Sequence, residues 1–269
     1  MQTNEPVGIG PSLQVIVYER ILEAIVRLDL APSARLVEGR LAAQLGVSRV
    51  PVREALRQLE REQLVVVHPR RGATVASLTS RDADEVYTLR ITLEALAARL
   101  AAENASGEQI RAIEEALRRQ ADCVSGNTTA QDVESFYAWG AKFHSQVVIA
   151  GDNEKLVALL RVISHHVARL RVIQSRLTSP EIMQLSLASH AEIFQAIAHR
   201  MGPEAQQLME EHVRRSRQRI VPQLDKVNGL VPDDGTARRA DILGRGSLSL
   251  GESSHADRSE VNLAEPTLD

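Results

Sequence analysis

The sequence predicts a mostly α-helical protein: a winged helix-turn-helix with a small two-stranded wing, followed by an all-helical bundle. Residues 41–59 read as two short helices separated at a glycine, and residues 64–76 contain two short β-branched runs around a turn. From residue 81 to about 221 the apolar residues recur at helical spacing between short breaks, with no strand pattern. The predicted parts are a flexible arm (1–11), a winged domain (12–77), a linker (78–80), a helical domain (81–222) and a disordered tail (223–269).

The composition limits the class of protein. A length of 269 residues allows one large or two ordinary domains, and the single cysteine excludes an internal disulfide framework. No apolar run approaches the length that spans a membrane, and residues 1–11 lack the basic start and apolar core of a signal peptide. We therefore expect a soluble cytoplasmic protein that has no membrane partner.

The winged domain is predicted to begin with a helix over residues 13–30, which ends at Ala31-Pro32-Ser33. Two short helices follow within residues 41–59. The second of them begins at Ser48, whose hydroxyl is expected to accept from a free N–H of the first turn. Pro51 fits the same turn, because the N–H that proline lacks would have no partner there.

Three arginines of this second helix, Arg49, Arg53 and Arg57, are spaced four residues apart. On a helix they form one cationic ridge, while the apolar residues of the segment fall on a different side. A helix held down by one side and carrying arginines on another is suited to the major groove of DNA. The plainer interpretation is a solvated basic face on an ordinary helical hairpin.

The segment that follows favours DNA binding. Residues 64–67 and 73–76 read as two short strands, and the turn between them carries Arg70, Arg71 and Gly72. Residues 35–72 contain eight arginines and four glutamates, a net charge of +4, whereas the whole chain is −3 and the remainder therefore −7. This asymmetry places a phosphate-binding surface on the N-terminal part.

The second part of the chain is predicted to be a bundle of six helices. Thr79 or Ser80 is expected to cap the first of them, with Asp82 in its first turn. Turn-forming residues separate the rest, and beyond residue 227 a Gly-, Ser- and Asp-rich stretch without sustained period predicts disorder. The predicted helices are 81–104, 107–124, 131–150, 153–177, 180–200 and 202–221.

The bundle carries three histidines on the apolar faces of three different helices: His144, His190 and His212. A single buried histidine is more often a structural residue than a ligand. Three of them are better explained by one shared metal ion or one anionic ligand, because each buried imidazole needs partners for both nitrogens. His166 lies near the apolar side of its helix and could face the same cavity. Arg90 could contact a carboxylate or pair with Glu94 along its own helix.

The N-terminal motif resembles a known family. The stretch LVEGRLAAQLGVSRVPVREALRQLEREQLVVVHPRRGATV is similar to the winged domain of GntR-family transcription regulators, apart from Ser33 and Gln63 where the family often has glycine. The resemblance implies a homodimer on a palindromic operator, with two recognition helices in adjacent major grooves. The DNA-binding residues expected from the motif and from the basic surface together are Arg40, Ser48, Arg49, Pro51, Arg53, Arg57, Arg70, Arg71 and Gly72.

Residues 81–221 resemble the FCD effector domain of the FadR-type branch, through Arg90-x-x-x-Glu94, Phe143-His144 and the run that begins at His190. In metal-binding members of that branch, an Asp four residues before the first histidine joins three histidines around zinc or nickel. His144, His190 and His212 match those histidines, but the Asp position is Gly140.

The missing carboxylate leaves two hypotheses open. Three histidines suffice for a zinc site if water or the carboxylate of an effector completes the shell. Alternatively, the metal has been lost and the histidines contact the effector directly. In both cases Arg90 and His166 are the further candidate effector contacts.

A metal hydrolase is the competing enzyme hypothesis, but the chain has no His-Glu-x-x-His, no Gly-rich phosphate loop and no Gly-x-Ser-x-Gly. A purely structural adaptor does not account for a basic winged helix joined to a bundle with an internal polar site. We therefore predict a ligand-responsive transcription regulator, most simply a repressor, that is not an enzyme. Its effector is predicted to be a small carboxylate, with one zinc or nickel ion per chain as the candidate cofactor.

Overall fold

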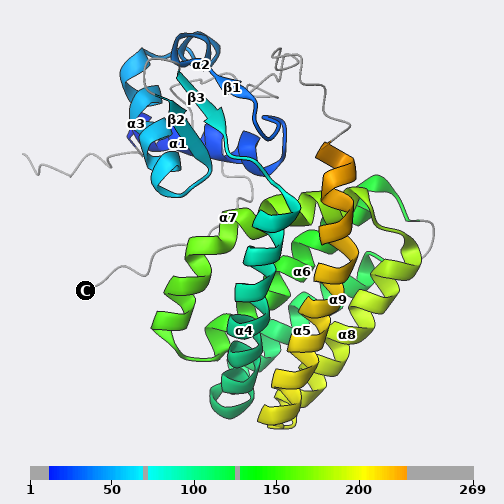
Figure 1. The fold of residues 1–269 in the computed structure, drawn as a ribbon. Coiled ribbons are helices and arrows are strands. Elements are labelled where there is room, and N and C mark those ends of the chain that lie inside the picture. Colours follow the sequence, from blue (N-terminus) through cyan, green and yellow to red (C-terminus); the bar gives the residue numbers. More distant parts are fainter. Residues whose placement is uncertain (1–11, 69–71, 125–127, 229–269) are drawn as a thin grey trace, which may run out of the picture.

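The computed structural model describes residues 12–68, 72–124 and 128–228, and it shows a small winged part above a larger helical bundle (Figure 1). The winged part consists of α1 (Leu13–Val26), β1 (Arg35–Leu36), α2 (Glu38–Leu45), α3 (Arg49–Arg61), β2 (Val65–His68) and β3 (Gly72–Val75). The bundle consists of α4 (Ser80–Asn104), α5 (Gly107–Asp122), α6 (Ala130–Ala150), α7 (Glu154–Arg176), α8 (Pro180–Ala198) and α9 (Gly202–Asn228). Within the described residues, no helix is both long and apolar enough to cross a membrane.

The sheet of the winged part has three antiparallel strands among the described residues, in the order β1-β3-β2. Arg35 pairs with Thr74 on one side of β3, and Val66 pairs with Thr74 on the other. The two predicted strands of the wing are confirmed as β2 and β3, and β1 joins them as a third strand that the sequence analysis did not predict. A strand of two residues is too short to show the alternation by which a strand is recognised.

The helix-turn-helix forms where it was expected. Gly46 ends α2 in the left-handed conformation, with φ of 66°, which a glycine adopts at little cost. Ser48 occupies the N-cap position of α3, but its side chain makes no capping hydrogen bond, so that part of the prediction was wrong. The first helix also ends earlier than expected, at Val26 rather than residue 30.

The linker leads directly into the bundle. Thr79 and Asp82 form a reciprocal capping box at the start of α4: Thr79 N–H donates to Asp82 Oδ2 at 2.9 Å, and Asp82 N–H donates to Thr79 Oγ1 at 3.1 Å. Both orphan donors of this helix end are satisfied by side chains, as the sequence predicted. The cap fixes where the first long helix of the bundle begins.

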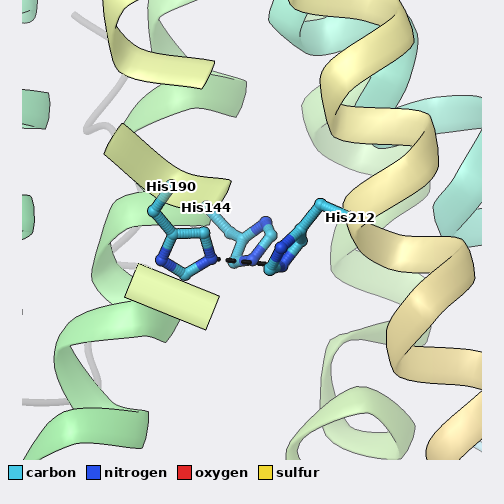
Figure 2. Close-up of side chains that lie close together, drawn as sticks. All are labelled: His144, His190 and His212. Carbon is cyan, nitrogen blue, oxygen red and sulfur yellow. Dashed lines mark hydrogen bonds between the residues drawn. The ribbon is translucent and has the colours of Figure 1, made fainter. Parts of the chain in front are cut away.

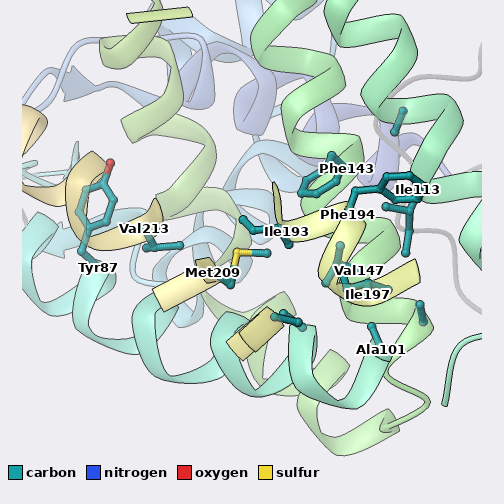
Figure 3. Packing of buried hydrophobic residues seen from close by; sticks show 14 of the residues in the cluster. Tyr87, Ala101, Ile113, Phe143, Val147, Ile193, Phe194, Ile197, Met209 and Val213 are labelled. Atoms are coloured by element: carbon teal, nitrogen blue, oxygen red, sulfur yellow. The ribbon is translucent and has the colours of Figure 1, made fainter. Parts of the chain in front are cut away.

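The core of the bundle forms around α4 and α9, which pack along each other (Figures 1 and 3). Small side chains of α4, such as Ala98 and Ala101, are completely buried and allow neighbouring helices to approach closely. Larger residues of α8 and α9, including Ile193 and Met209, fill the remaining space. This packing brings the inner faces of four helices, α4, α6, α8 and α9, together.

The bundle ends later than the sequence indicated. We predicted a boundary at residue 222, because the helical pattern of apolar residues runs to about residue 221. Instead α9 continues through Pro222 to Asn228, and Leu224 is completely buried beyond the proline. Burial of this side chain offsets the hydrogen bond that the proline cannot make. The predicted arm (1–11) and the remainder of the predicted tail (229–269) lie outside the described residues.

Candidate functional site

The structure brings the three predicted histidines together inside the bundle. His144 extends from α6, His190 from α8 and His212 from α9, and all three are buried (Figure 2). Nε2 of His190 lies 3.1 Å from Nε2 of His212. One ring nitrogen of each histidine lies within 4.8 Å of the corresponding nitrogen of the others. Two nitrogens bound to one tetrahedral zinc ion are about 3.3 Å apart, so the cluster has suitable dimensions.

Two neighbours determine which ring nitrogens carry protons. Nδ1 of His190 lies 2.7 Å from Oε1 of Gln120, which is an acceptor. Nδ1 of His144 lies 2.7 Å from Oε2 of Glu94, although this contact lacks regular hydrogen-bond geometry. A carboxylate oxygen so close to a ring nitrogen requires a proton between them, since both otherwise present lone pairs. In both histidines Nδ1 is therefore protonated, so Nε2 of the neutral ring carries a lone pair; in His190 this nitrogen accepts from Nε2–H of His212.

The surroundings favour neutral imidazoles. Burial lowers the pKa of His190 and His212 well below the ordinary histidine value, and the charges of the neighbouring histidines and arginines lower it further. Burial also lowers the pKa of His144, while the carboxylate of Glu94 acts in the opposite direction. Only a neutral imidazole has a lone pair to donate, so these rings are in the form that binds a metal ion.

The predicted pair on α4 is a buried ion pair at the edge of the cluster. Nε of Arg90 donates to Oε1 of Glu94 at 2.7 Å, and both side chains are less than a tenth exposed. Burial alone would raise the pKa of Glu94, but Arg90 and His144 together hold it well below its ordinary value. Glu94 is therefore ionised, and its charge is shared between the arginine and the histidine cluster.

A small cavity opens beside the histidines, and Arg90, Arg171 and Arg219 contribute to its wall. Among the described residues that line it, none is acidic. Burial and the nearby charge of Arg90 lower the pKa of Arg171 to about 10, so that side chain is still a cation at neutral pH. Polar side chains complete the wall: Tyr137, Gln174, Ser186 and Ser216. An anion is the ligand that this lining would stabilise.

The sequence analysis did not identify Gln120, Arg171 or Arg219 as site residues. Gln120 was detectable in principle, because it lies on the same helix face as the buried Ile113 and Ala116. Arg171 and Arg219 gave no comparable signal, since arginines on a helix usually face solvent. Their position in the cavity depends on how the helices pack.

The structure places His166 at a different site from the one predicted. Its Nε2 lies 3.2 Å from the carbonyl oxygen of Glu62 in the winged part, and it does not line the cavity. The structure therefore does not bring His166 to the cavity that the sequence analysis expected it to face. Helical spacing predicts which residues lie on the buried side of a helix, but it does not predict which other segment of the chain they contact.

The arginine ridge of α3 is exposed, while Val52 and Leu56 on its opposite side are buried. Arg53 makes a forked contact with Glu38 of α2: Nε donates to Oε1 at 3.1 Å and Nη2 donates to Oε2 at 2.8 Å. Arg57 pairs with Glu54 at 3.0 Å.

The other predicted DNA contacts take varied positions. Arg40, Ser48, Arg49 and Gly72 are exposed, Pro51 is half-buried, and Arg70 and Arg71 lie outside the described residues. The exposed residues among them are accessible to a partner.

Comparisons with known proteins match both parts of the chain. Residues 13–75 match the model of bacterial regulatory proteins of the gntR family, and residues 85–215 match the FCD domain. The chain is 30% identical over 195 residues to the HTH-type transcriptional regulator YdhC of Bacillus subtilis, covering 72% of this chain and 85% of that protein. It is also 30% identical over 210 residues to the Nta operon transcriptional regulator of Aminobacter aminovorans, covering 77% and 93%. Its fold is similar to that of E. coli McbR/YncC, with a TM-score of 0.65, 21% identity, and coverage of 80% and 99%.

Proposed function

The chain belongs to the GntR family of bacterial regulatory proteins and carries an FCD domain, and on this basis we propose that it is a cytoplasmic repressor controlled by a small anion. Its family and its relatives are transcription regulators rather than enzymes. The observation that supports the control by an anion is the cationic cavity beside the histidine cluster. Occupying an operator that overlaps a promoter would exclude the polymerase, and release by the anion would permit transcription.

We propose that α3 enters the major groove and that Arg49, Arg53 and Arg57 contact bases or phosphates there. The exposed ion pair between Arg53 of α3 and Glu38 of α2 supports this proposal, because it keeps the guanidinium at the surface of the helix-turn-helix. The proposed wing contacts of Arg70, Arg71 and Gly72 follow from the family motif, as does the role of Ser48 and Pro51 near the start of α3. Arg40 is proposed to contact a phosphate.

A palindromic operator requires two copies of the chain, and we propose a homodimer. Exposed apolar side chains on α4 and α7, two helices that pack against each other, support this. Leu89 and Leu96 of α4 are 47% and 39% exposed, and Leu159 and Val162 of α7 are 56% and 72% exposed. Apolar side chains that remain so exposed are candidates for burial between two copies.

We propose that the effector is a small carboxylate, with Arg171 as its main contact. Arg171 forms no ion pair within the described part of the chain, and the cavity wall that it shares with Arg90 and Arg219 is cationic. A carboxylate would neutralise this charge in a partly dehydrated site, where the attraction is stronger than in water.

His144, His190 and His212 are suited to holding one zinc or nickel ion through Nε2, because Glu94 and Gln120 already orient two of the rings. Such an ion would supply positive charge and an open position for the effector's carboxylate. Without a metal, the same nitrogens would donate or accept hydrogen bonds directly, which is the alternative version of this proposal.

The test combines DNA binding with effector binding on the purified full-length chain. A duplex operator is selected in vitro, and its affinity is measured by fluorescence anisotropy at several salt concentrations, where a steep loss with salt is expected. Small mono- and dicarboxylates are then screened for thermal stabilisation and for release of the duplex. Arg171→Met should abolish both effects, whereas Lys155→Met, which replaces an exposed cation of the same helix, should preserve them. No selected duplex would refute the regulator proposal; a duplex insensitive to every anion would refute only the effector part.

A further inference from the structure

Gly140 and Gln120 share one small space next to the histidine cluster. Gly140 lies one turn before His144 on α6. A Cβ atom added to Gly140 would lie 2.7 Å from Nε2 of Gln120 and 3.6 Å from Cε1 of His190. Real Cβ atoms do not approach a neighbour to 2.7 Å, so any side chain at residue 140 must displace the amide of Gln120.

The amide of Gln120 is held from both ends. Its Nε2 donates to the carbonyl oxygen of Phe136 at 3.2 Å, and its Oε1 lies 2.7 Å from Nδ1 of His190. The side chain is 1% exposed, so neither partner can be exchanged for water. Because a backbone carbonyl only accepts, the amide nitrogen must face Phe136 and the amide oxygen must face His190.

We propose that Gln120 is a positioning residue that keeps the proton of His190 on Nδ1 and thereby directs the Nε2 lone pair into the histidine cluster. The backbone carbonyl of Phe136 sets the orientation of the amide, and the amide sets the tautomer of the ring. The importance of this for ligand binding rests on the proposed role of the cluster as a cation or effector site.

The close packing of Gln120 against Gly140 also determines which side chains are available to bind an ion at the histidine cluster. Since Gly140 has no side chain and its space is filled by Gln120, α6 contributes only His144 to the cluster. The three ring nitrogens themselves bring no negative charge, so a divalent ion bound by them would keep more positive charge toward an incoming ligand than one bound with a further carboxylate. The pair of Gly140 and Gln120 therefore selects an anionic effector over a neutral one.

The direct test is the tautomer of His190, measured on the metal-free full-length protein labelled with 15N-histidine. Long-range 1H–15N spectra distinguish a proton on Nδ1 from one on Nε2. We expect Nδ1 protonation in the wild type, a mixture in Gln120→Met, and recovery in Gln120→Glu, which restores an acceptor. Gly140→Ala should reproduce the effect of Gln120→Met by displacing the amide, and Gln218→Met on the exposed side of α9 is the control.

Zinc affinity gives a second readout with the metal alone as the probe. Loss of an orienting partner typically weakens metal binding by about 10- to 100-fold, and Gln120→Met and Gly140→Ala should both show such a loss. The inference is overturned if His190 carries its proton on Nε2 in the wild type, or if both variants keep the wild-type tautomer. If the tautomers change as expected but the wild type binds no zinc, the role of Gln120 stands and only the metal part of the proposed function fails.

A different set of contacts supports a second inference, about how α7 joins the two parts of the chain. Glu62 caps the C-terminal end of α3, and its carbonyl oxygen lies 3.2 Å from Nε2 of His166. Nδ1 of His165 lies 3.4 Å from the Glu62 carboxylate. Nη2 of Arg169 donates at 2.8 Å to the carbonyl oxygen of Ala76, which follows β3. One face of α7 therefore contacts both the recognition helix and the segment that leads into the bundle.

The opposite face of α7 reaches the cavity. Arg171 is two residues beyond Arg169, a rotation of about 200° on a helix, and it lines the cavity. Arg169 is completely buried, yet its Nε and Nη1 have no hydrogen-bond partner. Unsatisfied donors on a buried guanidinium cost free energy, so this residue stabilises the docked arrangement less than a fully paired guanidinium would. We infer that α7 transmits occupancy of the cavity from Arg171 to the winged part through Arg169 and His166.

A double-mutant cycle tests this without a known effector, with affinity for an operator selected in vitro as the readout. Arg171→Met removes the cavity charge and should change operator affinity several-fold. In an Arg169→Met background, Arg171→Met should change operator affinity by less than about twofold, because the contact of α7 with Ala76 is already lost. Lys155→Met, at an exposed position of α7 that does not line the cavity, serves as the background control. Equal effects of Arg171→Met in all three backgrounds would overturn the inference.

Discussion

Two ion pairs on α4 share the same spacing and similar geometry but differ in burial, and Glu94 of the buried pair also contacts His144. Arg90–Glu94 and Arg99–Glu103 both join residues four apart, with N–O distances of 2.7 and 2.8 Å. The side chains of the first pair are 4% and 6% exposed, and those of the second are 49% and 43% exposed. Replacing each glutamate by glutamine keeps the size and removes the charge. We predict that Glu94→Gln destabilises the protein strongly and that Glu103→Gln does not.

The magnitudes follow from the environment of each pair. Removing one partner of a buried pair leaves the other charge uncompensated, which costs about 3–5 kcal/mol. An exposed pair of the same geometry contributes less than about 1 kcal/mol, because water screens both charges. For a protein of this size about 1 kcal/mol corresponds to roughly 2–4 °C in Tm, so Glu94→Gln should lower Tm by about 6–20 °C.

Urea and thermal unfolding at neutral pH, followed by circular dichroism, measure the difference. Losses in unfolding free energy that agree within about 1 kcal/mol for the two variants would refute the reasoning, because burial would then have no influence. The pH dependence gives an independent check. Since the pKa of Glu94 is held well below 4.5, its stabilisation is present above that value and is lost only as the pH falls through the lowered pKa. The gap between wild type and Glu94→Gln should persist at pH 5 and close only in stronger acid.

Four further outcomes are expected. Arg53→Ala should weaken operator binding by about 10- to 100-fold in anisotropy measurements if it reads a base, and Arg61→Ala, at the far end of α3, should have little effect. His190→Ala should abolish the anion response while operator binding without effector is retained; a normal response would exclude the cluster from the effector site. Elemental mass spectrometry should find roughly one zinc or nickel ion per chain, absent from His144→Ala. Val162→Glu should shift the chain from dimer toward monomer in light scattering after size exclusion, and an unchanged mass would remove this surface from the proposed interface.

Local sequence patterns were sufficient to predict several features of the structure. The spacing of Arg49, Arg53 and Arg57 placed them on one exposed side of α3 because a helix repeats every 3.6 residues, whatever surrounds it. The cap formed by Thr79 and Asp82 is likewise made within four residues. Features of this kind depend on neighbours in the chain, so they can be predicted without knowledge of the packing.

Other features could not be predicted, because they depend on contacts with residues that are distant in the sequence. The two-residue strand β1 exists only because β3 offers it partners. His166 was expected in the cavity, but the winged part supplies the carbonyl group that it contacts. The apolar pattern indicated an end of the last helix near residue 221, yet α9 continues through Pro222 and the bundle buries Leu224 beyond it. In each case a contact with a remote segment outweighed the local signal.

The sequence by itself determined the class of the protein: a basic winged helix-turn-helix, a helical bundle behind it, and three histidines on inward faces. Those properties follow from periodicity, charge and turn chemistry, which act over a few residues. Only the tertiary structure decided what the histidines meet. Gln120 is 70 residues from His190 along the chain, and the Arg171 side chain reaches the cavity only through the packing of α7. A binding site made from several helices depends on how those helices pack, because burial and the close approach of charges arise only when the separate faces are brought together.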